Sequence, residues 1–191
     1  FGRKKDGVEE YDCDTSGIVA LLDAMKSSAV AKLSIADCDI GPKGLMTSAP
    51  LISVIPALTA VNVSMNKCFD AQSAKGFIDA VLKSNVKTLT FGPKTAFTLL
   101  IGVSSEEKSL DYSNQDFGPG ELMLISSLVI PFSTAMTKID ISKNNIGADG
   151  AKALADVIPA SKIETLVIGG IAPQYVGGQD EKNGVEISTR G

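Results

Sequence analysis

The chain has 191 residues, 44% of them hydrophobic, a net charge of −4, and neither His nor Trp. Without His, triad hydrolysis and His-ligated metal sites are excluded. The mixed charges argue against nucleic-acid binding, because phosphate contact needs clustered positive charge. No apolar run is long enough for a membrane span.

The predicted elements recur in a fixed order: a short strand, a polar turn, a helix and the next strand. The first helix is expected at 17–27. The strands that follow are marked by one apolar position each: Leu33, Val61, Leu89, Leu110, Ile139 and Leu166. A second marker, Val-Ile-Pro, ends three helices, at 54–56, 129–131 and 157–159. A strand marker recurs with a period of about 28 residues, which predicts a solenoid of stacked repeats.

The clearest repeat spans Lys138–Ile168. Its turn residue, Asn144, is expected to pair backbone groups that have no partner strand where the chain leaves the sheet. Gly147 opens the helix, and Pro159 ends it. The spacing of apolar residues predicts that the buried stripe of this helix is Ala151, Leu154, Ala155 and Ile158.

The repeat pattern breaks between Leu89 and Leu110, which lie closer together in the chain than the other consecutive markers. A Gly92-Pro93 step and a run rich in β-branched and aromatic residues predict an extended segment or a hairpin at about 91–108 in place of a helix. Such a segment is either a docking element for a partner or a short repeat without a helix. Two polar stretches, Phe1–Asp14 and Ala172–Gly184, are predicted to be surface loops.

These repeats resemble the leucine-rich repeat family, in its ribonuclease-inhibitor-like subclass, over roughly Ser16–Ile168. The resemblance implies an α/β fold: a right-handed solenoid, or horseshoe, with a parallel sheet on the concave face and helices on the convex face. It also implies protein–protein recognition as the usual role. We predict that residues 1–191 form one such domain of about six to seven repeats. Because the chain begins within a repeat, we expect a fragment of a longer solenoid.

Strand alternation predicts which side chains line the concave face. The candidate binding residues are Lys32, Ser34, Asn62, Thr90, Asp111, Lys138, Asp140 and Ser142. They are mostly small and polar, and no Trp, Tyr or Arg, the usual hot-spot residues, stands among them. A solvated sheet surface without a partner is the alternative interpretation.

No catalytic residue, metal site or cofactor is predicted. Asp37 and Asp39 flank Cys38, and Asp12 and Asp14 flank Cys13, but each pair offers too few oxygens for a hard cation. Three cysteines do not make a disulfide framework. Cys38 and Cys68 fall at inward positions and are predicted to be reduced, which favours an intracellular, cytoplasmic location, although an organelle stays open.

We therefore predict a non-enzymatic protein-interaction scaffold, or a structural subunit of a larger intracellular assembly. Its partner would be another protein, not a nucleic acid, a membrane or a small molecule. The alternative is a regulator of an enzyme, of the inhibitor or GTPase-activating type of this family. The inhibitor carries more Cys and aromatic residues, and the activator relies on an acidic tail that this chain lacks.

Overall fold

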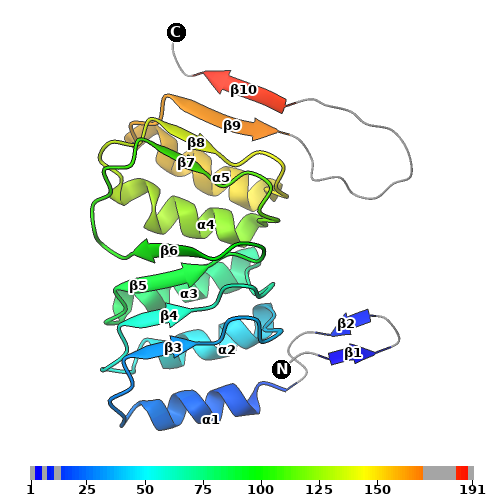
Figure 1. The fold of residues 1–191 in the computed structure, drawn as a ribbon, viewed down its shortest axis with the longest axis vertical. Coiled ribbons are helices and arrows are strands. Elements are labelled where there is room, and N and C mark those ends of the chain that lie inside the picture. Colours follow the sequence, from blue (N-terminus) through cyan, green and yellow to red (C-terminus); the bar gives the residue numbers. More distant parts are fainter. Residues whose placement is uncertain (1–2, 6–7, 11–13, 170–183, 189–191) are drawn as a thin grey trace. The chain divides into compact units, whose positions relative to one another are not determined.

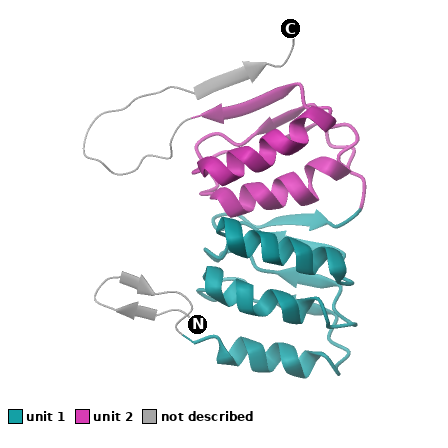
Figure 2. Cartoon of the chain, turned by 180° about the vertical axis from the view of Figure 1, so that it is seen from behind, with its two compact units in different colours: residues 1–102 teal, residues 103–191 magenta. Residues whose placement is uncertain are grey.

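The computed structural model describes residues 14–169 in full, together with the backbone of residues 3–5, 8–10 and 184–188. The chain divides into two compact units, unit 1 (residues 1–102) and unit 2 (residues 103–191), which Figure 2 colours separately. In each unit the helices lie on one face of a small sheet (Figures 1 and 2). Each unit is therefore an α/β layer pair, as the repeat pattern predicts.

Unit 1 alternates helices and strands. Its elements are β1 (Arg3–Lys5), β2 (Val8–Glu10), α1 (Ser16–Met25), β3 (Lys32–Ser34), α2 (Pro42–Ile52), β4 (Ala60–Asn62), α3 (Ala71–Lys83), β5 (Thr88–Phe91) and β6 (Phe97–Leu100). Strands β3, β4 and β5 are parallel, and Leu33, Val61 and Leu89 lie in register with less than a tenth of each residue exposed. The strand positions that the repeat period predicted are confirmed here.

The N-terminal segment contains a strand pair where the sequence predicted a loop. Strands β1 and β2 run antiparallel, and their register sets Arg3 opposite Glu10 and Lys4 opposite Glu9. The prediction of a loop over Phe1–Asp14 is therefore wrong for these strands.

The segment that breaks the repeat forms a hairpin, as predicted. Strand β6 pairs antiparallel with β5, so a strand stands where the pattern would place a helix. The turn needs Gly92, whose φ is +114° and whose Cβ, if present, would clash with the carbonyl oxygen of Thr95. Phe91 and Phe97 face each other across the strand pair, with ring centroids 6.2 Å apart. The hairpin thus closes the sheet of unit 1.

Unit 2 repeats the same alternation. Its elements are β7 (Ser109–Asp111), α4 (Pro119–Leu128), the 3-10 helix η1 (Ile130–Phe132), β8 (Lys138–Asp140), α5 (Gly147–Val157), the 3-10 helix η2 (Ile158–Ala160), β9 (Thr165–Gly169) and β10 (Gly184–Ser188). Strands β7, β8 and β9 are parallel, and β10 pairs antiparallel with β9. The predicted loop Ala172–Gly184 falls outside the described residues, except that Gly184 begins β10.

The turn asparagines pair backbone groups at the strand ends, as predicted, and they also bond to the preceding repeat. Asn66 donates from Nδ2 to the carbonyl oxygens of Ile35, Val63 and Ser64, and its Oδ1 accepts from the N–H groups of Cys38 and Ile40. Such groups, buried without a partner, would each cost roughly 1–3 kcal/mol. One amide side chain therefore ties the end of β4 to the preceding repeat.

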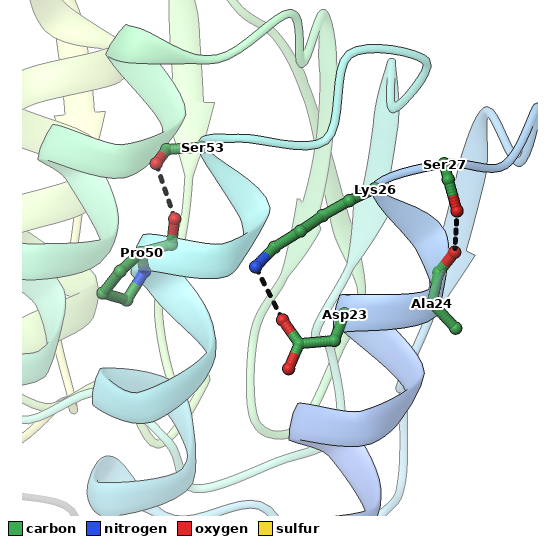
Figure 3. Close-up of polar contacts among 6 residues, drawn as sticks. All are labelled: Asp23, Ala24, Lys26, Ser27, Pro50 and Ser53. Atoms are coloured by element: carbon green, nitrogen blue, oxygen red, sulfur yellow. Dashed lines mark hydrogen bonds and ion pairs between the residues drawn. The ribbon is translucent and has the colours of Figure 1, made fainter.

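Serine side chains cap the C-terminal ends of several helices by hydrogen bonds. At α1 the Ser27 hydroxyl donates to the Ala24 carbonyl at 3.5 Å, and at α2 the Ser53 hydroxyl donates to the Pro50 carbonyl at 2.7 Å (Figure 3). These bonds satisfy carbonyl groups of the last turn that have no partner within the helix. The neighbouring ion pair between Lys26 and Asp23 is largely exposed and adds little.

The two units repeat one another in their turns as well as in their elements. Ser84 in unit 1 and Ser161 in unit 2 occupy equivalent positions: each donates to the carbonyl of the third residue before it and accepts from the N–H of the second residue after it. Gly92 directly follows the third parallel strand of unit 1, and Gly169 is the last residue of the third parallel strand of unit 2; their φ angles are +114° and +149°, and each precedes an antiparallel strand. The chain therefore carries one module of three parallel strands and a closing strand twice.

The predicted buried stripe of α5 is wrong for two of its four residues, Ala151 and Ala155. Leu154 is buried as predicted, but Ala151 and Ala155 are exposed, Ile158 is half-buried, and Gly150 is buried instead. A Cβ at Gly150 would lie 3.1 Å from the Leu122 Cβ, so α5 meets α4 at this glycine. The predicted stripe was based on apolar residues, which include Ala but not Gly. It therefore missed the close contact between the two helices at Gly150.

Candidate protein-interaction surface

The outward face of the sheet in unit 1 is built from strand residues that alternate with the buried ones. The register aligns Ser34, Asn62 and Thr90 in one row across β3, β4 and β5, and Lys32 lies in the neighbouring row. Lys32 and Ser34 are exposed, and Asn62 and Thr90 are half-buried. The structure therefore brings the four candidates of this unit together on one face, as strand alternation predicted.

Strand β6 extends this face with two residues that the sequence analysis missed. Thr98 continues the row of Thr90, and the two hydroxyl oxygens are 3.0 Å apart. Leu100 lies opposite Thr88, in the row of Lys32, and is 58% exposed. The β-branched run predicted a strand here, but its register, which sets the face of each side chain, depends on the hairpin turn.

The other four candidates lie in unit 2. Asp111 on β7 stands directly opposite Asp140 on β8, and Lys138 stands in the neighbouring row opposite Ser109. Ser142 follows the end of β8, where it is half-buried. Asp111 and Lys138 are exposed, and Asp140 is half-buried. This face therefore presents two carboxylates and one ammonium group, whereas the face of unit 1 presents hydroxyl and amide groups and the ammonium group of Lys32, but no carboxylate among its candidates.

The side chains of three candidates also stabilise the ends of their own strands by hydrogen bonds. The Oδ1 atoms of Asn62, Asp111 and Asp140 each accept the N–H of the serine that follows the next residue, at 3.0, 2.8 and 2.9 Å. Hydrogen bonds from Ser113 are the main cause that lowers the pKa of Asp111, and the charge of Lys138 adds a smaller effect. Asp111 is therefore ionised at neutral pH and offers its remaining acceptor positions to solvent or a partner.

The eight candidates fall into two groups of four, one in each unit. The curvature that would make this face concave stays a prediction. No residue pattern within one repeat could have revealed this division.

The described part of the chain contains no cluster of metal-ligating side chains. Among residues 14–169 no three His, Cys, Asp or Glu side chains stand together in a way that could hold a metal ion. Cys68 is buried and Cys38 is half-buried, as predicted for inward repeat positions. Within the same residues, no helix has the length and apolar character that crossing a membrane requires.

The comparisons with known proteins agree with the repeat pattern. A family model described as Leucine Rich repeat matches residues 30–47 and residues 132–155. The first match covers β3 and the start of α2, and the second covers β8 and most of α5, so each unit holds one match. A comparison with curated proteins found no match. The chain therefore contains leucine-rich repeat segments, which are typical of protein-interaction domains.

Proposed function

We propose that this chain is a non-enzymatic protein-interaction module that binds another protein through the outward faces of its sheets. The proposal rests on the rows of small and polar side chains that these strands present. The strand ends are held in place by hydrogen bonds from the side chains of Asn66 and Asn144. A framework fixed in this way loses little conformational entropy on binding. The two leucine-rich repeat matches support the same role.

The binding residues proposed are the eight candidates, with Leu100 added as an apolar anchor. In unit 1, Lys32, Ser34, Asn62 and Thr90 lie on β3 to β5, and the exposed Leu100 extends the same face on β6. In unit 2, Asp111, Lys138, Asp140 and Ser142 form a more charged surface. A partner that contacts both surfaces would therefore meet hydroxyl, amide and apolar groups with one ammonium group on the first surface, and two carboxylates with one ammonium group on the second.

More specifically, we propose that the chain is a scaffold or a structural subunit within an intracellular assembly. The inward positions of Cys38 and Cys68 support a reducing compartment. The net charge of −4 supports a protein partner over a nucleic acid. Regulation of an enzyme is the alternative, and it predicts that the captured partner changes its turnover when the chain is added.

The test is affinity capture with the full chain and three matched variants. Asp140→Lys and Thr90→Lys alter the two sheet faces, and Lys152→Glu alters an exposed position on α5. We expect the partner bound by the wild-type chain to be lost from one or both sheet-face variants and retained by Lys152→Glu. Equal capture by all four chains, or loss only with Lys152→Glu, would refute binding through the sheet faces.

A further inference from the structure

A buried carboxyl group lies at the start of α4. Glu121 is 3% exposed, and its Oε2 accepts the N–H of Gly118 at 2.9 Å, which caps the helix. The ion pairs found in the described part of the chain join Lys26 to Asp23 and Lys152 to Asp156. Glu121 therefore has a helix-capping partner but no cation to balance its charge.

The charged groups around Glu121 do not compensate the negative charge that its carboxylate would carry. Asp116, in the loop before α4, is exposed and negative. The helix α5 packs against α4 through Gly147 and Gly150, and its charged residues are all exposed: Asp149, Lys152 and Asp156. The 3-10 helix η1, which follows α4, carries no charged residue. Burial therefore raises the pKa of Glu121 to about 7, the Gly118 N–H opposes the rise, and Asp116 adds to it.

The fold does not require this carboxyl group. In unit 1 the equivalent helix α2 begins with the same Gly-Pro step, and Gly44 occupies the place in α2 that Glu121 occupies in α4. The residues before the two helices have nearly the same backbone angles: φ −99° and ψ −174° at Gly41, and φ −98° and ψ −172° at Gly118. Unit 1 therefore starts this helix without an ionisable side chain at that place, so the charge in unit 2 is an addition to the common module.

We propose that Glu121 is a pH-sensitive element of unit 2, because its ionisation places a buried negative charge without a balancing cation at the packed start of α4 and so destabilises it. The direction follows from proton binding. The folded chain holds the Glu121 proton more tightly than the unfolded chain does, so the folded state is favoured at low pH. This stabilisation is complete below about pH 4.5, declines as the pH rises and is lost above about pH 7. The effect is independent of the proposed interaction function.

The test compares urea unfolding of the full chain at pH 5 and pH 8. Between these values the unfolding constant of the wild-type chain should rise roughly 50- to 100-fold more than that of Glu121→Gln, as a pKa change from 4.5 to about 7 requires. The variant Asp149→Asn, which removes an exposed carboxyl group from the same helix layer, should keep the wild-type change. The same pH dependence in wild type and Glu121→Gln would overturn the proposal.

A second measurement does not depend on how the variant folds. In the wild-type chain, a carbon-13 NMR titration should place the midpoint of the Glu121 side-chain carboxyl near pH 7. A midpoint near 4.5, the ordinary value for Glu, would overturn the proposal even if Glu121→Gln did not fold.

Discussion

The side-chain oxygen of Asn144 accepts a hydrogen bond from the backbone N–H of Phe117, at 3.1 Å, across one repeat. The same oxygen accepts from the N–H of Gln115, and Nδ2 donates to the carbonyl oxygens of Tyr112, Ile141 and Ser142. Asn66 makes the same five bonds in unit 1. Because these bonds fix the loops at the strand ends, they also fix the side chains proposed to bind a partner.

We expect Asn144→Ala to lower the free energy of unfolding by about 3 kcal/mol, because several backbone groups lose their partner in a buried site. The adjacent Asn145→Ala, at an exposed position, should change it by less than about 0.5 kcal/mol. Urea denaturation of both variants measures the difference. Equal losses would show that the Asn144 side chain does not stabilise the turn.

The register of β8 predicts opposite outcomes for two adjacent residues. Ile141 is 0% exposed, so Ile141→Asp would bury an unpaired charge and should unfold unit 2. Asp140→Asn retains an oxygen that can accept the Ser142 N–H, so it should change the free energy of unfolding by less than about 0.5 kcal/mol. Circular dichroism and thermal denaturation distinguish the two. Similar stability of the two variants would mean that the strand faces are assigned wrongly.

The same substitution, Gly to Ala, should change the free energy of unfolding in opposite directions at two glycines. Gly92→Ala should lower the free energy of unfolding by about 2–4 kcal/mol, because φ is +114° and the new Cβ would meet the Thr95 carbonyl. Gly76→Ala, at an exposed position inside α3 with nothing within 4 Å of the new Cβ, should raise it by up to about 1 kcal/mol. Denaturant midpoints test both. A neutral Gly92→Ala would contradict the hairpin turn.

Met65 occupies a left-handed backbone position, with φ +59°, and is 45% exposed. Asn tolerates this conformation better than Met, so Met65→Asn should raise the free energy of unfolding by about 0.5–1 kcal/mol. Met46, another exposed methionine, lies within α2, and Met46→Asn should lower it by about 0.5 kcal/mol. Thermal denaturation compares the two. A loss of stability with Met65→Asn would indicate that the Met65 side chain makes contacts that outweigh its backbone strain.

The spacing of apolar residues predicted the architecture of each unit well because the repeat imposes the same burial at each copy. Leu33, Val61 and Leu89 are buried in parallel register for this reason. The hairpin was also predictable, since the Gly92-Pro93 step interrupts the pattern and β-branched residues follow it. The two turn asparagines were identified from their equivalent places in the repeat, where an amide can both donate to and accept from the backbone.

Other features depend on contacts between distant residues and left no local signal. The close approach of α5 to α4 at Gly150 follows from the position of Leu122, not from hydrophobic periodicity. The exposure of Leu100 on the sheet face follows from the register of β6. The burial of Glu121 could have been suspected only by comparing the two Gly-Pro helix starts, where Gly44 stands at the same place.

The most direct test of the central claim is hydroxyl-radical footprinting of the full chain, alone and with its captured partner. Three exposed and reactive side chains report on different surfaces: Leu100 on the sheet face of unit 1, and Met46 and Leu82 on the helices α2 and α3. We expect the partner to protect Leu100 and to leave Met46 and Leu82 unchanged. Protection of Met46 and Leu82 with Leu100 still reactive would contradict binding through the sheet face and assign the partner to the helices.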